Sequence, residues 1–179
     1  MTYSTSNSHF NEAAATSLLV SQLLSMDDSN WGVFDRTGSR ISGVILSGDD
    51  RHDLVSRIAS SCRFVTIEED GEELAEMRTG LVPNYDLIPK AFANAQGVSE
   101  TLGAPVVLYI RNFGAIGALD LSKRSPHFEK SRFVTQVVDG LYAIECDSSR
   151  VFVIVSSGEE LELTLTRPGR LCTLERLTA

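Results

Sequence analysis

Long apolar runs are missing from this 179-residue sequence, although 42% of its residues are hydrophobic. No uninterrupted run approaches the roughly 18 residues that a membrane-spanning helix needs. The first ten residues also lack the basic start and apolar centre of a secretory signal peptide. We therefore expect a soluble, cytoplasmic protein with no membrane insertion.

Cysteine and histidine are scarce, with three residues of each type. Cys62, Cys146 and Cys172 are far apart, form no CxxC pair and lie in or beside apolar stretches. The histidines share no metal-ligand spacing with each other or with the cysteines. This pattern predicts free core thiols in a reducing compartment and no structural metal.

Basic residues are also few, with 16 Lys and Arg against 24 Asp and Glu, which gives a formal net charge of −8. Affinity for nucleic acids comes mainly from Lys and Arg side chains that neutralise phosphates. The charge therefore argues against a nucleic-acid partner. The length suits one domain with a single core.

Apolar runs of strand length alternate with segments of helical periodicity along the chain. Strands are expected at residues 43–47, 63–67, 106–110, 150–156 and 171–177. Helices are expected at residues 12–26, 51–61, 89–102 and 128–142, with an acidic stretch, 68–76, leading into a short helix that ends near residue 80.

This alternation predicts an α/β protein, a three-layer α/β/α sandwich around a mostly parallel five-stranded sheet. The run at 106–110 is apolar throughout, so we expect a central strand covered on both faces. Residues 1–11, rich in Ser, Thr and Asn, are expected to form a disordered N-terminal tail before a single domain at residues 12–179.

The order of these segments resembles the large α/β subdomain of AAA ATPases, within the P-loop NTPase superfamily. The segments that carry the resemblance are SGVILSG at 42–48, DLVSRIAS at 53–60, VVLYIRNFGAIG at 106–117, RVFVIVSSG at 150–158 and LTRPGRL at 165–171. They stand at the positions of the Walker A strand and its helix, Walker B, sensor 1 and the arginine fingers. The resemblance implies the sheet order 5-1-4-3-2 and a chain that stops where the helical lid would begin.

The Walker A region is degenerate in this comparison. A P-loop uses glycine-rich backbone N–H groups and a Lys to hold phosphates, and a Ser or Thr to hold magnesium. The corresponding residues here are Gly48, Asp49, Asp50, Arg51 and His52. The loop is about three residues short and lacks the GK[ST] ending. Its two aspartates repel an anion, so bound ATP and magnesium are not expected.

The Walker B and sensor 1 positions have also changed. Walker B normally supplies an acid for the magnesium shell and an acid that polarises the attacking water. Arg111 and Asn112 stand there, and Ser157 or Gly158 stands where sensor 1 usually has Asn. The comparison therefore predicts no catalytic residue and no cofactor.

The RPGR motif matches the family pattern. The resemblance implies that Arg167 and Arg170 are arginine fingers, which reach the nucleotide of a neighbouring subunit. A turn with two solvated arginines is the structural alternative.

These features lead to a hypothesis of a catalytically inactive, AAA ATPase-like domain, a structural or regulatory subunit of a ring assembly with AAA-family or other protein partners in a hetero-oligomer. Two alternatives stay open. One is a weak ATP-binding ATPase that uses Arg51 in an atypical loop. The other is an unrelated α/β protein-interaction domain.

Overall fold

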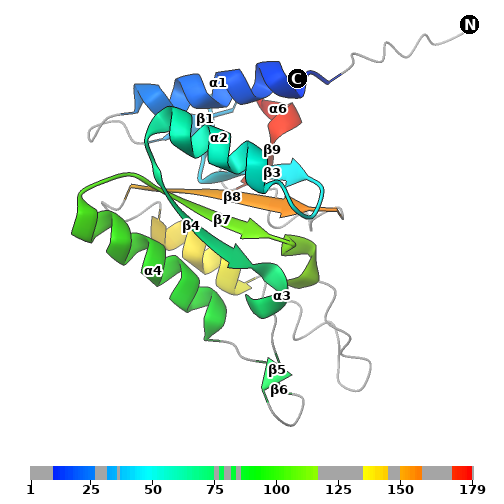
Figure 1. The fold of residues 1–179 in the computed structure, drawn as a ribbon, viewed down its shortest axis with the longest axis vertical. Helices are drawn as coiled ribbons and strands as arrows, with labels where there is room; N and C mark the ends of the chain where they lie inside the picture. Colours follow the sequence, from blue (N-terminus) through cyan, green and yellow to red (C-terminus); the bar gives the residue numbers. More distant parts are fainter. Residues whose placement is uncertain are drawn as a thin grey trace, which may run out of the picture.

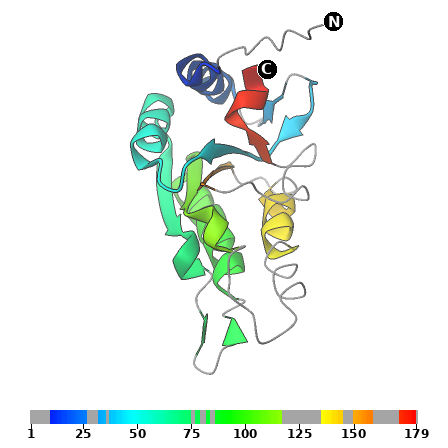
Figure 2. The same cartoon turned by 90° about the vertical axis from the view of Figure 1, so that its right-hand side faces the viewer.

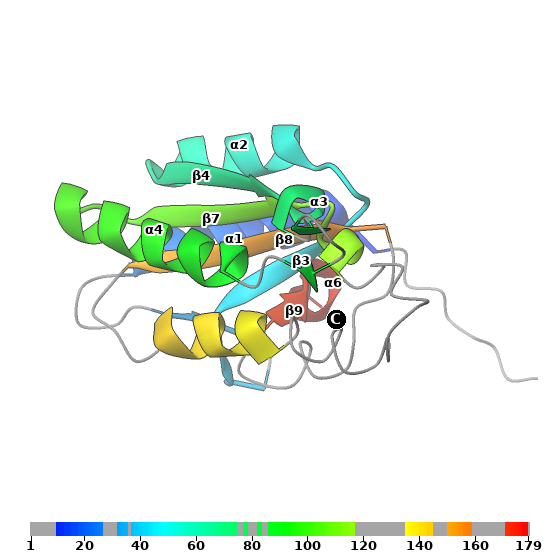
Figure 3. The same cartoon turned by 90° about the horizontal axis from the view of Figure 1, so that it is seen from below.

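The computed structural model describes residues 10–26, 32–35, 37–74, 77–78, 82–83, 86–116, 135–144, 150–158 and 171–178. Its main sheet consists of β3 (Gly43–Ser47), β4 (Val65–Asp70), β7 (Val106–Arg111), β8 (Val151–Ser157) and β9 (Leu171–Thr173). The strands are arranged in the order β4-β7-β8-β3-β9, which Figure 3 shows along the sheet. All four neighbouring pairs are parallel.

Counted along the chain, these strands follow the order 5-1-4-3-2, which the family resemblance implied. Helices cover both faces of the sheet (Figure 1). On one face lie α1 (Glu12–Ser25), α2 (His52–Cys62) and α6 (Leu174–Thr178). On the other lie α4 (Leu87–Leu102) and a helix over residues 135–144. The predicted three-layer α/β/α sandwich is therefore confirmed.

Short elements complete the described structure. They are β1 (Val33–Phe34) paired with β2 (Arg40–Ile41), α3 (Gly71–Leu74), β5 (Met77–Arg78) paired with β6 (Val82–Pro83), and the 3-10 helix η1 (Phe113–Ile116). None of the two-residue strands had a strand signal in the sequence.

Two hydrophobic clusters lie on opposite faces of the sheet. Val106, Leu108 and Ile110 of β7 join the cluster with α4, whereas Val107 and Tyr109 join the cluster with α1 and α2. Side chains alternate between the two faces of a strand, so an apolar run with both faces covered marks a central strand. The predicted central position of this run is confirmed.

Local chemistry sets the ends of the helices. The side chain of Asn11 caps α1 by accepting a hydrogen bond from the Ala14 N–H at 3.1 Å, so Asn11 belongs to the helix start and not to a tail. Residues 1–9 lie outside the described part of the chain. The α2 helix is capped at its carboxyl end by Arg63, which has a left-handed backbone with φ 58°, and α4 is capped by Gly103, with φ 59°.

Two predicted boundaries are wrong for physical reasons. Arg63 is the cap of α2, so β4 begins at Val65 and continues to Asp70, through acidic residues expected in a loop. Only residues 171–173 of the segment 171–177 form a strand, because the rest turns into α6 and packs against α1. The helix expected at 128–142 is described at 135–144, and residues 128–134 lie outside the described part.

Candidate functional site

The carboxyl ends of β3, β7 and β8 meet at one edge of the sheet, where open parallel α/β sheets usually carry their sites. The structure brings together the loop after β3, the end of β7 and the end of β8. The Gly48 N–H donates to the Ser157 carbonyl at 2.9 Å, and the Asn112 N–H donates to the Asp49 carbonyl at 2.8 Å. Residues that were singled out in three separate motifs therefore contact one another.

Asp49 is the centre of these contacts. Its carbonyl also accepts a hydrogen bond from the Ser156 hydroxyl at 2.6 Å, and its carboxylate accepts one from the Gly158 N–H at 2.6 Å. A Cβ on residue 158 would lie 2.7 Å from Asp49 Oδ1, so the absence of a side chain at Gly158 permits this approach. The loop is thus bonded to the sheet at both the backbone and the side chain of Asp49.

A buried hydroxyl chain supports the same loop from below. The Arg51 N–H donates to the Tyr109 hydroxyl at 2.7 Å, and the Tyr109 and Ser156 hydroxyls lie 2.9 Å apart. Since Ser156 donates to the Asp49 carbonyl, Tyr109 donates to Ser156, and one set of proton positions satisfies all three bonds. Burial raises the pKa of the Tyr109 phenol above its ordinary value, although the bond with Ser156 lowers it. Tyr109 therefore stays neutral near pH 7.

The sequence analysis missed Tyr109 and Ser156. Both are fully buried, and both lie in strands that are otherwise apolar. Hydroxyl groups inside such strands were the available signal, because a buried hydroxyl needs a hydrogen-bond partner.

The N-terminus of α2 has its leading donors occupied. A helix N-terminus attracts anions when its first N–H groups are free. Here the Arg51 N–H is bonded to Tyr109, and the His52 N–H donates to Asp50 Oδ1 at 2.9 Å. An anion at this position would have to displace these internal acceptors.

Arg51, considered above as a replacement for the P-loop lysine, has other partners. Arg51 Nη1 donates to the Ser47 carbonyl at 2.8 Å, and Arg51 Nη2 lies 2.7 Å from Glu12 Oε1 on α1. These contacts join the loop, the end of β3 and α1.

Arg111 has acidic partners on the neighbouring strand. It stands opposite Asp70 in the register of β4 and β7. Its Nη2 lies 2.6 Å from Asp70 Oδ2, its Nε lies 3.5 Å from Glu68 Oε1, and Glu68 Oε2 in turn lies 2.7 Å from His52 Nδ1. The charges at this edge therefore form an internal network.

The structure does not place the two residues that were predicted as arginine fingers. Arg167 and Arg170 both lie outside the described residues.

Among the residues that are described, no group of three His, Cys, Asp or Glu is placed to hold a metal ion. None of the described helices is long and apolar enough to cross a membrane. Cys62 and Cys172 are buried free thiols, and Cys146 is not among the described residues.

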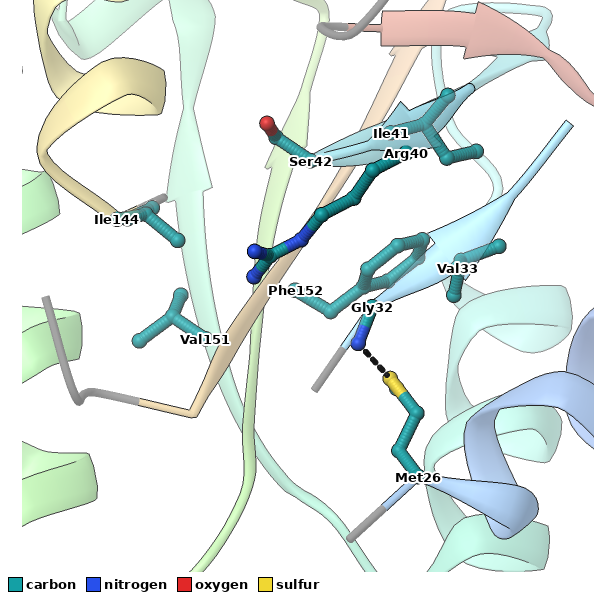
Figure 4. Close-up of a pocket in the computed structure, with 9 residues that line it drawn as sticks. All are labelled: Met26, Gly32, Val33, Arg40, Ile41, Ser42, Ile144, Val151 and Phe152. Atoms are coloured by element: carbon teal, nitrogen blue, oxygen red, sulfur yellow. Dashed lines mark hydrogen bonds between the residues drawn. The ribbon is translucent and has the colours of Figure 1, made fainter. Parts of the chain in front are cut away.

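A small hollow lies near the amino ends of β3 and β8 (Figure 4). Met26, Gly32, Val33, Arg40, Ile41, Ser42, Ile144, Val151 and Phe152 line it. The Gly32 N–H donates to Met26 Sδ at 3.0 Å across one side. Its volume of about 10 Å³ holds about one water, so it does not accommodate a nucleotide.

Comparisons with known proteins give a fold likeness only. No family model matches the sequence, and no curated protein matches it. A chain of a solved structure, "Structure of E. coli MS115-1 HORMA:CdnC:Trip13 complex", superposes with a TM-score of 0.55 at 15% identity. The match covers 74% of this chain and 48% of that chain, so it spans about half of the neighbour's length.

The assignment to the AAA ATPase family is corrected by these findings. A likeness at 15% identity, found in a complex of several proteins, points to no AAA domain specifically, and no family model supports one. The apolar strands and their order, which carried the resemblance, are properties of the fold and are shared well beyond one family. The finger role of Arg167 and Arg170 rested on that assignment.

Proposed function

We propose that this chain is a protein-binding domain with a three-layer α/β/α fold that does not bind or hydrolyse nucleotide. The observation that carries the proposal is the position of Asp49, whose carboxylate accepts the Gly158 N–H and whose carbonyl accepts the Asn112 N–H and the Ser156 hydroxyl. The carboxylate of Asp49, which is itself an anion, therefore already occupies a backbone N–H donor at this site.

Electrostatics supports the same conclusion. A triphosphate needs several free N–H donors and a cation. The donors of Gly48, Arg51 and His52 are bonded within the protein. Arg51 and Arg111 are both paired with acids. Binding would require breaking these contacts in a loop that also carries Asp49 and Asp50.

The end of β7 lacks the groups that hydrolysis requires. Magnesium needs oxygen ligands, and the attacking water needs a base or a group that orients it. Arg111 is a cation, and the Asn112 backbone, with φ 49°, is turned so that its N–H bonds to Asp49. Catalysis is therefore not the role that we propose.

A protein-binding role is consistent with the origin of the structural neighbour, which was solved in a complex with other proteins. We therefore expect the partners of this chain to be proteins that bind to its surface.

Titration calorimetry with ATP and magnesium tests the proposal. We expect no binding heat up to about 1 mM nucleotide, which corresponds to less than about 4 kcal/mol of binding free energy. We also expect no phosphate release in a hydrolysis assay. A micromolar Kd would overturn the proposal and support the alternative of an ATP-binding protein with an atypical loop.

A further inference from the structure

The strand β4 forms an open edge of the main sheet. It is six residues long and pairs with β7 on one side only. No strand in the described part of the chain pairs with its other side, and Figure 3 shows β4 as the outermost strand, beside α2. Val65 is 36% exposed, and Thr66 and Glu68 are exposed as well. With six residues, β4 has the length of a typical strand in a globular protein.

The direction of the backbone groups on β4 follows from one hydrogen bond. The Val65 N–H donates to the Pro105 carbonyl at 3.0 Å, toward β7. Backbone groups alternate in direction along a strand, so Ile67 and Glu69 also face β7. The N–H and C=O groups of Thr66, Glu68 and Asp70 therefore face the open side. Such a row is a template for another strand.

Acidic residues dominate the carboxyl half of this edge. Glu68 and Asp70 are paired with Arg111 on the inner side. Glu69 and Glu73 repel each other, and none of the described cations forms an ion pair with either of them. Burial, and then the charge of Glu73, raise the pKa of Glu69. A cation brought to this position would relieve the repulsion.

The same charges argue against a second copy as the occupant. Like charges on paired strands are destabilising, and two β4 edges would bring two sets of acids together. The net charge of −8 on each chain adds to this repulsion. Charged edges of this kind prevent indiscriminate pairing and admit a strand of opposite charge.

We propose that the β4 edge binds an extended, basic segment of a partner protein, which adds a sixth strand to the sheet. The backbone of this segment bonds to Thr66, Glu68 and Asp70, and its Lys or Arg side chains reach Glu69 and Glu73. This inference rests on the proposed protein-binding function and names the surface and the chemistry of the partner.

A proline at Thr66 tests the backbone part of the proposal. Thr66→Pro removes an N–H that faces outward and leaves the bonds to β7 in place, because proline is tolerated at the outer side of an edge strand. The probe is a fluorescein-labelled peptide of alternating Lys and Val, measured by anisotropy with the full chain. We expect Thr66→Pro to weaken binding about tenfold or more, and the matched variant Thr66→Ala to bind like the wild type.

Charge variants test the recognition of basic residues. Glu69→Gln combined with Glu73→Gln should weaken peptide binding, whereas Glu100→Gln, an exposed acid on α4, should leave it unchanged. A peptide with Glu in place of Lys should not bind. Equal losses in the double variant and in Glu100→Gln would show that the peptide responds to net charge alone, and would overturn the assignment to this edge.

Amide exchange measured by NMR distinguishes strand addition from loose electrostatic attraction. The peptide should slow exchange at Thr66, Glu68 and Asp70, while Val65, Ile67 and Glu69 should be slow with or without it. Circular dichroism of Thr66→Pro checks that the fold is retained. Peptide binding without this protection overturns the proposal, even if Thr66→Pro binds less.

A failure at the edge can be separated from a failure of the proposed function. If ATP and magnesium do not bind and native partners purify equally with wild type and Thr66→Pro, the protein-binding function stands and the β4 edge is not its site. If ATP binds with micromolar affinity, the proposed function fails whatever the peptide does.

Discussion

Single hydroxyl groups hold the candidate site together at the residue scale. The Tyr109 hydroxyl accepts the Arg51 N–H and bonds to Ser156, and so connects the start of α2 with β7 and β8. This buried oxygen is therefore one of the contacts that fix the loop conformation.

Tyr109→Phe should lower the free energy of unfolding by about 1–3 kcal/mol, because it leaves the Arg51 N–H without its acceptor in a partly buried position. Urea unfolding followed by circular dichroism measures the change. Ser61→Ala, which removes an exposed hydroxyl from α2, serves as the control and should change stability by less than about 0.5 kcal/mol. Equal effects of the two substitutions would show that the hydroxyl chain has no special role.

Tyr109 should also make the folded protein less stable at alkaline pH. Burial raises the folded-state pKa of Tyr109 above its value in the unfolded chain, which is about 10. The native state then holds the proton more tightly, so this stabilisation is complete below about pH 10 and is lost as pH rises through the folded-state pKa. Unfolding in urea at about pH 8 and about pH 10.5, under reducing conditions, measures the loss.

Tyr109→Phe should lose less stability than the wild type between these two pH values. Burial also raises the pKa of Cys62 and Cys172, but both proteins contain these thiols, so the difference between them isolates the phenol. Parallel pH profiles for the two proteins would contradict the prediction.

At the scale of elements, two glycines in helices have opposite surroundings. Gly97 in α4 has no atom within 4 Å of the position of an added Cβ, whereas a Cβ on Gly140 would lie 2.6 Å from the ring of Phe92. Gly97→Ala should therefore stabilise the protein by about 0.5–1 kcal/mol through helix propensity alone.

Gly140→Ala should destabilise the protein by about 1–3 kcal/mol, because the helix over residues 135–144 cannot approach α4 as closely. Thermal unfolding of the two variants gives shifts of opposite sign if the packing is as described. A stabilising Gly140→Ala would mean that Phe92 moves aside without loss.

Elements with a strong local pattern were predicted well from the sequence. The continuous apolar runs of β7 and β8 and the alternation of strands and helices predicted the layers, whereas the strand order was implied by the family resemblance. Predictions failed where local patterns fit two structures. The segment LCTLERL was expected to be a strand throughout, but its second half is a helix that packs against α1. Arg63 in a left-handed conformation was likewise not predictable from its side chain.

The candidate site was predictable in position but not in its contacts. Gly48, Asn112 and Ser157 were singled out because the family resemblance placed them at the Walker A, Walker B and sensor 1 positions, and the carboxyl ends of parallel strands bring such residues together. The bonds from Asp49 to Gly158 and from Tyr109 to Ser156 depend on how three strands are offset. That offset is a tertiary property, and no short stretch of sequence contains it.

At the scale of the whole molecule, the two described thiols report on how the fold opens. Cys62 ends α2 and Cys172 lies in β9, and both are buried in the same cluster. Their raised pKa values keep them protonated and slow to react. Alkylation therefore depends on opening of the structure.

In a Cys146→Ser background, Cys172 should react with iodoacetamide about tenfold faster than Cys62, because a short edge strand opens before the core. Timed alkylation followed by mass spectrometry measures both rates. Equal rates would show instead that β9 and α2 open together as one cooperative unit.

The contact between α1 and α6 has a mechanical consequence. The two helices pack side by side (Figure 1), so the two ends of the described chain lie on the same side of the sheet. A force that pulls on Glu12 and Thr178 first separates these helices and then peels β9, which pairs with β3 over three residues. We expect the longer strand pairings among β3, β8, β7 and β4 to bear this force only after β9 has separated from β3. The domain should therefore begin to unfold at its α6 end when it is pulled.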